Sequence, residues 1–271
     1  MDVDLRLFAD ARIHVIRLTG TATSIRPGEP VALDDKNAYT IEVEGAETWI
    51  GWSDLSNILN EYTFAFDGAP VGDLTIDREE DEDQHDQVEL KGDLKSALGL
   101  RFEIEGRPEV TPDGRIRIRT TSVQALDIPV EGLMHALGLD AADLMGNLEE
   151  RGLSFEGDDL ILDASRAFPP PRMSGRVVAV RVEEGGLSIT LGDPDAAPRP
   201  GRANHLWFRG GMILIGRMTQ TNADLRILDD DPRDPFDFVP DQMNSQLAAG
   251  YAKMSTEGAL TMFVPDYNDI R

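Results

Sequence analysis

Apolar and polar residues alternate along much of the chain, which is the period expected of strands with one buried face. In residues 12–18 (RIHVIRL) the alternation places Ile13 and Val15 on one face, and Arg17 continues the same row. Residues 39–43 (YTIEV) alternate in the same way. Both segments are therefore predicted to be strands.

Two further alternating segments flank a short turn. Residues 101–105 (RFEIE) place Phe102 and Ile104 on one side, and residues 115–119 (RIRIR) repeat the pattern with two isoleucines. Between them stands Thr-Pro-Asp-Gly at 111–114, in which proline presets φ and glycine accepts a positive φ. The pattern predicts an antiparallel meander with one dry face and one charged face.

A long hairpin is predicted near the middle of the chain, in residues 167–192 (AFPPPRMSGRVVAVRVEEGGLSITLG). Gly185 and Gly186 allow the reversal. The prolines at 169–171 cannot donate hydrogen bonds to a neighbouring strand, so they form a stiff, extended lead-in. The dry face is expected to carry Val178, Val180, Val182, Leu187, Ile189 and Leu191.

Helical spacing of apolar residues occurs in two places. Residues 53–61 (SDLSNILNE) predict a helix capped by Ser53, with Asp54 in its first turn. Pro129 suits the first position of a second helical region, which should end near Gly152. The stripes comprise Leu55, Ile58, Leu59, Tyr62, Val130, Leu133, Met134 and Leu137. Such a stripe is typical of a packed core, and the functional alternative is that it lines an elongated ligand cavity.

The chain changes character after residue 193. Residues 193–204 (DPDAAPRPGRAN) have no period and are rich in Pro, Ala and Gly, so this segment is predicted to be a linker or a seam between sub-domains. Beyond it, we expect strands at residues 205–209, 212–215, 223–228 and 259–264, and a short helix at 240–250.

The charge balance limits the classes of partner. The chain has 26 Lys and Arg against 50 Asp and Glu, a formal net charge of −24. This argues against nucleic acid and against docking on an anionic membrane through a basic patch.

The chain has no cysteine, which removes disulfides and thiolate chemistry. No stretch approaches the roughly 18 apolar residues of a membrane span, and the first residues lack the basic and apolar regions of a signal peptide.

Candidate catalytic and metal-binding groups are scattered. The acidic runs at 77–86 and 229–237 lack the spacing of a calcium loop. The four histidines have no ligand spacing, and neither a nucleophile elbow nor a P-loop is present. We therefore expect no enzyme, no cofactor and no metal site. A hydrolase that uses carboxylates near the second acidic run is the weakest alternative.

Part of the chain, about residues 40 to 192, resembles the LmeA-type bacterial phospholipid-binding proteins. The order of elements matches, and the segment 152–192 carries most of the likeness. Its matching positions are Gly152, Gly157, Leu160, Leu162, Pro170, Pro171, Gly175, Val178, Val180, Leu187 and Ile189. Those proteins are similar in fold to the TULIP (tubular lipid-binding) superfamily, in which a highly curved antiparallel sheet wraps a long helix and encloses an apolar tunnel for acyl chains.

The resemblance implies an α+β, mostly β fold, in which residues 1–192 form a TULIP-like lipid-binding domain. Residues 193–271 form a β-rich extension, either separate or packed on the same sheet. The implied function is non-catalytic binding or carriage of phospholipid or fatty acyl chains, with at most transient membrane contact, in a bacterial cell envelope or periplasm. The alternative is a structural or protein-interaction module with a side-chain-filled interior. The lipid would contact Leu55, Ile58, Leu59, Tyr62, Phe102, Ile104, Val130, Leu133, Met134, Leu137, Val178, Val180, Leu187 and Ile189.

Overall fold

The computed structural model describes residues 2–8, 10–79, 86–95, 101–125, 128–129, 147–196 and 204–270. The chain divides into two compact units. Unit 1 comprises residues 1–48, 170–174 and 193–271, and unit 2 comprises residues 49–169 and 175–192. The division differs from the boundary expected at residue 193, because the N-terminal strands belong with the C-terminal segment.

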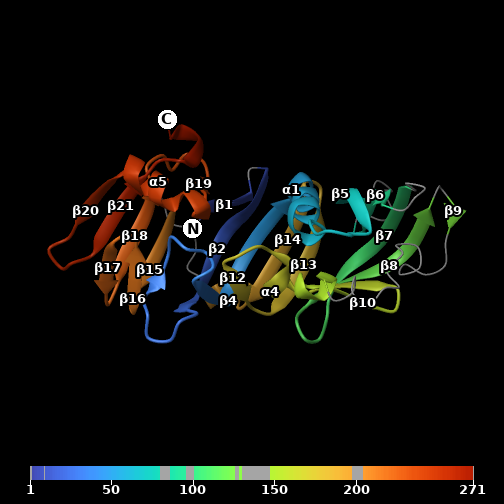
Figure 1. Ribbon diagram of the computed structural model, residues 1–271, viewed down its shortest axis with the longest axis horizontal. Coiled ribbons are helices and arrows are strands. Elements are labelled where there is room, and N and C mark those ends of the chain that lie inside the picture. The colour runs from blue at the N-terminus through green and yellow to red at the C-terminus, as the bar shows by residue number, and fades with distance from the viewer. Residues whose placement is uncertain are drawn as a thin grey trace. The chain divides into compact units, whose positions relative to one another are not determined.

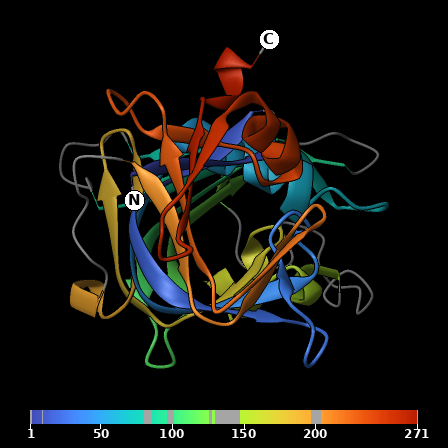
Figure 2. The same ribbon diagram turned by 90° about the vertical axis from the view of Figure 1, so that its left-hand side faces the viewer.

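Unit 1 is built from three sheets (Figures 1 and 2). Its strands are β1 (Val3–Phe8), β2 (Ala11–Ser24), β3 (Val31–Ala32), most of β4 (Tyr39–Gly51), β12 (Arg172–Ser174), β15 (His205–Arg209), β16 (Met212–Ile215), β17 (Met218–Thr221), β18 (Asp224–Asp229), β19 (Phe236–Phe238), β20 (Tyr251–Met254) and β21 (Leu260–Val264). Its helices are α5 (Met243–Ala249) and three 3-10 turns, Pro194–Ala196, Pro240–Gln242 and Tyr267–Asp269.

Pairing between distant segments explains why the two ends of the chain share one unit. β1 pairs antiparallel with β2 and parallel with β19, with Val3 opposite Phe236. A second sheet has the order β15-β18-β21-β20, and a third joins β17 and β16 to β3, so that Ile213 lies opposite Val31. The predicted strands at 12–18, 205–209, 212–215, 223–228 and 259–264 are confirmed, as is the helix within 240–250.

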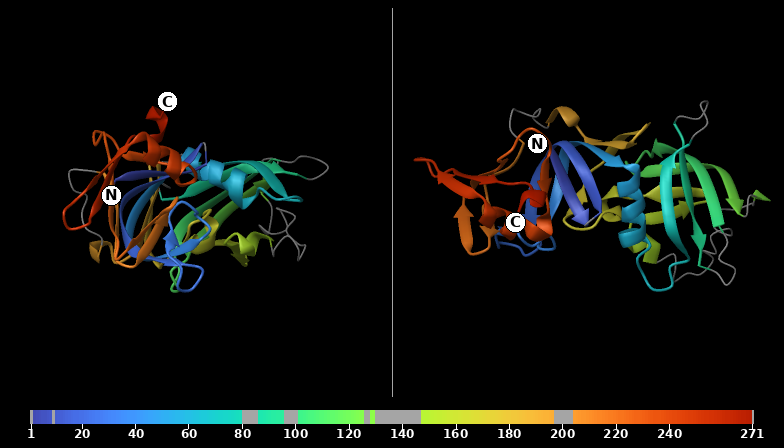
Figure 3. Two further views of the ribbon diagram at one scale, coloured as in Figure 1. Left: turned by 60° about the vertical axis from the view of Figure 1, so that its left-hand side comes forward. Right: turned by 90° about the horizontal axis from the view of Figure 1, so that it is seen from above.

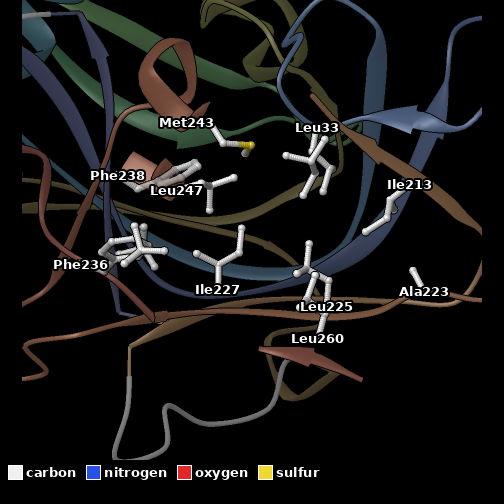
Figure 4. Packing of buried hydrophobic residues seen from close by; sticks show 13 residues of the cluster. Leu33, Ile213, Ala223, Leu225, Ile227, Phe236, Phe238, Met243, Leu247 and Leu260 are labelled. Atoms are coloured by element: carbon white, nitrogen blue, oxygen red, sulfur yellow. The ribbon is translucent and has the colours of Figure 1, made fainter. Parts of the chain in front are cut away.

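The core of unit 1, here called the unit 1 core, lies between these sheets and helix α5. Figure 4 shows Met243 and Leu247 of α5 on one side and Leu225 and Ile227 of β18 on the other. Phe236 is fully buried in the same core and packs against Phe238, with 5.6 Å between the ring centroids. Strand alternation therefore supplies one wall of the core, and a short amphipathic helix supplies the other.

Unit 2 is centred on a curled antiparallel sheet with the order β10-β11-β8-β7-β6-β5 (Figure 3). Its elements are α1 (Trp52–Ile58), the π-helix Leu59–Thr63, β5 (Val71–Arg78), β6 (Val88–Leu94), β7 (Arg101–Val110), β8 (Ile116–Ala125), β9 (Ile128–Pro129), β10 (Leu153–Glu156), β11 (Asp159–Leu162), α4 (Ala164–Ala167), β13 (Val177–Glu183) and β14 (Gly186–Gly192). The mostly β, α+β fold with a curled antiparallel sheet is thus confirmed.

The meander predicted around Thr-Pro-Asp-Gly is the β7–β8 hairpin. The Thr111 amide donates to the Arg115 carbonyl at 2.9 Å, and Gly114 adopts the positive φ (84°) that the turn requires. Phe102 and Ile104 are buried on one face. On the other face Arg117 pairs with Glu156 at 2.6 Å, so the predicted division into a dry and a charged face is confirmed.

The β13–β14 hairpin corrects one predicted side-chain position. Val178 is 46% exposed, whereas Val177 is 1% exposed. The pairing register shifts between Val177 and Ala179, so Val178 is the extra residue of a β-bulge. Because the bulge shifts the alternation, the side chain of Val177 points to the same face of the hairpin as those of Val180 and Val182. Across the hairpin, Leu187 and Ile189 are buried as expected.

Helix α1 also begins differently from the prediction. Gly51, not Ser53, is the N-cap residue, and no side chain caps the helix. Ser53 is an exposed residue inside the first turn, where Asp54 also lies, as expected. The helix continues as a π-helix from Leu59. Pro129, predicted to be the first helical residue, lies instead in strand β9. The helical region predicted after it lies outside the described residues, except that residues 147–150 are helical.

Candidate lipid-binding site

The curled sheet of unit 2 carries an apolar cluster, here called the unit 2 cluster. Its buried members are Val71, Leu74, Phe102, Ile104, Leu148 and Leu153. Packed against them are side chains that remain partly exposed, namely Leu59, Phe64, Phe66, Leu90, Leu94, Val123, Phe155, Leu160 and Leu162. The described part of the cluster therefore combines a small buried centre with a broad, partly exposed apolar margin.

Strand register brings these side chains together. Leu90 on β6, Ile104 on β7 and Val123 on β8 lie directly opposite one another across three neighbouring strands. They therefore share one face of the sheet. Gly92 lets this layer pack closely, since a Cβ at that position would lie 2.5 Å from a methyl carbon of Leu74 and 3.0 Å from the Phe102 ring.

Helix α1 and the π-helix that continues it to Thr63 are here called the helical segment. Polar side chains of this segment attach it to the edge strand β5. Asn60 Nδ2 donates to the Leu74 carbonyl at 2.7 Å, and Asn60 Oδ1 accepts from the Leu74 amide at 2.9 Å. One turn earlier, the Ser56 hydroxyl oxygen accepts from the Ile76 amide at 2.9 Å. These side chains occupy backbone groups that an edge strand otherwise leaves open. The helix is thereby fixed beside the cluster, and Leu59 packs onto it.

Arg151 stands at the margin of the unit 2 cluster, two residues before buried Leu153. Its guanidinium carbon lies 5.3 Å from the ring centroid of Phe66 and 5.6 Å from that of Tyr62. The guanidinium also donates to the Tyr62 carbonyl. Among the described residues no carboxylate pairs with it. The arrangement places a half-buried cation, held by two aromatic rings, beside a partly exposed apolar surface.

The predicted contact residues fall into several groups. Leu59, Phe102 and Ile104 belong to the unit 2 cluster. Ile58, Leu187 and Ile189 are buried, and Leu55, Tyr62 and Val180 are half-buried. Val178 points outward at the bulge and is not placed for contact with a ligand in the interior. Val130, Leu133, Met134 and Leu137 lie outside the described residues.

Sequence reasoning missed the β10–β11 hairpin, which contributes four members of the cluster. Leu153 pairs with Leu162 and Phe155 with Leu160, so all four side chains share one face. The available signal was the alternation in residues 153–156 (LSFE), the apolar residues at 160–162 and the turn at Gly157, which has a positive φ of 67°.

The acidic run at 229–237 forms a hydrogen-bonded loop in unit 1. Asp237 accepts from the Arg6 guanidinium at 2.7 and 3.1 Å, and its amide donates to Asp266 at 2.7 Å. Burial and the neighbouring Asp229 and Asp234 raise the pKa of Asp266 to about 6, although its own hydrogen bond from the Asp237 amide lowers it.

In the described part of the chain, no three His, Asp or Glu side chains gather as metal ligands. Residues 80–85 of the other acidic run lie outside the described residues.

No described helix combines the length and the apolar character needed to cross a bilayer. A scan against protein-family models, a search of curated proteins and a search of solved structures each found no match for the chain.

Proposed function

We propose that unit 2 binds the acyl part of a lipid against the unit 2 cluster, without catalysis. The observation that carries the proposal is the partly exposed apolar margin, which includes the rings of Phe64, Phe66 and Phe155. Apolar side chains left partly in water cost free energy that a ligand could recover, about 25 cal/mol per Å² covered. An acyl chain supplies such cover, gaining about 0.8 kcal/mol for each buried CH₂.

Arg151 indicates what kind of headgroup the proposed ligand carries. Its guanidinium is oriented by the rings of Tyr62 and Phe66 and pairs with no described carboxylate. A phosphate or carboxylate headgroup would complete its hydrogen bonds while the acyl chain covers the neighbouring apolar margin. The expected ligand is therefore an anionic lipid.

The first experiment asks what the purified protein carries. Native mass spectrometry, before any lipid is added, should detect a phospholipid or fatty acid in near-stoichiometric amount. Organic extracts should contain the same species at a level above that of an unrelated protein purified in parallel. Extracts no richer than this control would contradict the proposal and favour the alternative, an interaction module whose interior is filled by side chains.

Matched variants locate the site. Arg151→Gln should reduce retention of anionic lipid, whereas Arg181→Gln, an exposed arginine on β13 of the same unit, should not. Val123→Trp should reduce occupancy of every lipid, because the added ring occupies the space above the half-buried valine. Unchanged occupancy in Val123→Trp would place the ligand elsewhere. Unchanged headgroup preference in Arg151→Gln would remove only the role given to Arg151.

A further inference from the structure

The four-stranded sheet of unit 1 has an outer face that the lipid proposal does not use. Leu206, Leu225, Ile227 and Leu260 point from this sheet into the unit 1 core. Alternate residues therefore point the other way. In register across β15, β18, β21 and β20, the outer residues form one row of Trp207, Arg226, Thr261 and Lys253, and a second row of His205, Leu228, Phe263 and Tyr251. Together with Arg209 and Asp224 these residues are called the aromatic–basic face.

Trp207 anchors one half of this face. It is 41% exposed, and its indole Nε1 donates to Asp224 at 2.8 Å. The guanidinium carbons of Arg209 and Arg226 lie 4.7 and 4.5 Å from its ring centroid. Stacking on the ring restricts both arginine side chains, so their N–H groups are pre-arranged at the surface.

Lys253 occupies the other half in the same manner. Its Nζ lies 4.8 Å from the ring centroid of Phe263 and 5.3 Å from that of Tyr251. The two rings are stacked 4.7 Å apart, and Tyr251 is 48% exposed. The rings lie under the cations, so the face offers positive charge above a flat aromatic layer.

The three cations of this face differ from the arginines that pair with carboxylates, such as Arg6 with Asp237 at 2.7 Å and Arg17 with Glu47 at 2.5 Å. In the part of the chain that the structure describes, Arg209, Arg226 and Lys253 form no ion pair, although acidic residues outnumber basic ones 50 to 26. The face is thus a local positive surface on an acidic protein.

We propose that the aromatic–basic face docks a carboxylate-rich segment of a partner protein. Charge complementarity identifies the chemistry, because arginine forks bind carboxylates with two parallel hydrogen bonds. The aromatic layer would accept the apolar or aromatic side chains that stand between the carboxylates of such a segment. The segment needs to be no longer than the width of four strands.

Two other anionic partners fit less well. Nucleic-acid binding draws mainly on Lys and Arg side chains that neutralise phosphates, whereas this face supplies three cations against a net charge of −24. An anionic bilayer attracts each basic residue at its surface by about 1 kcal/mol, but it repels the carboxylates that give the chain its net charge of −24. A short polypeptide avoids both costs.

The test uses the full-length protein and a fluorescein-labelled octapeptide of alternating Glu and Tyr, with binding followed by fluorescence anisotropy. The same peptide with Gln in place of Glu, a labelled oligo-dT, and vesicles containing phosphatidylglycerol are the comparison probes. We expect the Glu–Tyr peptide to bind best, and its affinity to fall as salt is raised.

Arg226→Gln should weaken peptide binding by about tenfold. Arg217→Gln, which removes the same charge from an exposed turn of unit 1, should change it less than about twofold. Trp207→Leu should also weaken binding, since the arginines lose their support. Circular dichroism should show native folding for all three, because none of these side chains is buried. No binding of the Glu–Tyr peptide, equal effects of Arg226→Gln and Arg217→Gln, or preference for oligo-dT or vesicles would overturn the proposal.

Discussion

The two units bury their apolar residues to different degrees. Among described residues, the unit 1 core has 13 buried members and five partly buried ones, whereas the unit 2 cluster has six buried and nine partly buried members. Unit 1 covers its sheets with each other and with helix α5. Unit 2 has a curled sheet with the helical segment fastened at one edge. The difference separates a core whose described members are mostly buried from a cluster whose described members are mostly partly exposed.

The largest expected effect tests the closed core. Phe236→Ala should cost about 3 to 5 kcal/mol of unfolding free energy, because the fully buried ring leaves a cavity. Phe155→Ala, at the margin of the unit 2 cluster, should cost about 1 kcal/mol, because its ring is already partly in water. Urea unfolding measures both values. Equal costs would remove the contrast between the two units.

The attachment of the helical segment in unit 2 is tested by Asn60→Ala. The variant leaves the amide and the carbonyl of Leu74 without their partner, which should cost about 2 to 3 kcal/mol. Ser53→Ala is the control, since that exposed serine caps nothing, and its cost should stay below about 0.5 kcal/mol. A loss of about 1 kcal/mol in Ser53→Ala would instead restore the capping role that the sequence suggested.

Two cross-strand neighbours sharpen the description of the unit 2 cluster. Ile104 is buried and Val123, directly opposite it, is half-buried. Ile104→Trp should cost about 1 to 3 kcal/mol through overpacking, whereas Val123→Trp has room for the ring and should cost less than about 1 kcal/mol. Thermal unfolding of delipidated protein gives the comparison. Similar losses in both variants would mean that the margin is packed as tightly as the centre.

The smallest effect concerns a polar group beside the unit 1 core. The pKa of Asp266 is raised to about 6, chiefly by burial, so the folded protein binds a proton more tightly than the unfolded chain between about pH 4 and 6. The contribution of Asp266 to stability therefore falls as pH rises through this window. Asp266→Asn keeps an oxygen to accept from the Asp237 amide and should raise the melting temperature at pH 7 by about 2 °C. The gain should shrink at pH 4, and a larger gain at pH 4 than at pH 7 would contradict this assignment.

The local sequence pattern was sufficient to predict strands that have one apolar face and a turn marked by proline and glycine. The β7–β8 hairpin could be predicted because Phe102 and Ile104 alternate with charges and because Gly114 marks the turn. The buried row of β2, with Ile13 and Val15, was evident for the same reason.

Features that depend on distant partners could not be read from local pattern. The parallel pairing of β1 with β19 joins Val3 to Phe236, and no local period encodes it. The bulge at Val178 changes the alternation without any glycine to announce it. Asn60 resembles an ordinary polar residue of a helix until β5 is beside it. The candidate site was therefore only partly predictable, since the unit 2 cluster is assembled from six strands and from helical and loop residues between them.

The pairing of β1 with β19 also sets an order of events during translation. Val3 is synthesised before Phe236, and the chain between them corresponds to roughly 10 to 50 seconds of translation at typical rates. All residues of unit 2 leave the ribosome within that interval. The nascent β1–β2 hairpin must meanwhile keep one edge open, and an open edge can recruit the wrong strand. Unit 1 is thus completed after the inserted unit 2 has been synthesised, and β19 closes the edge of β1 that was open until then.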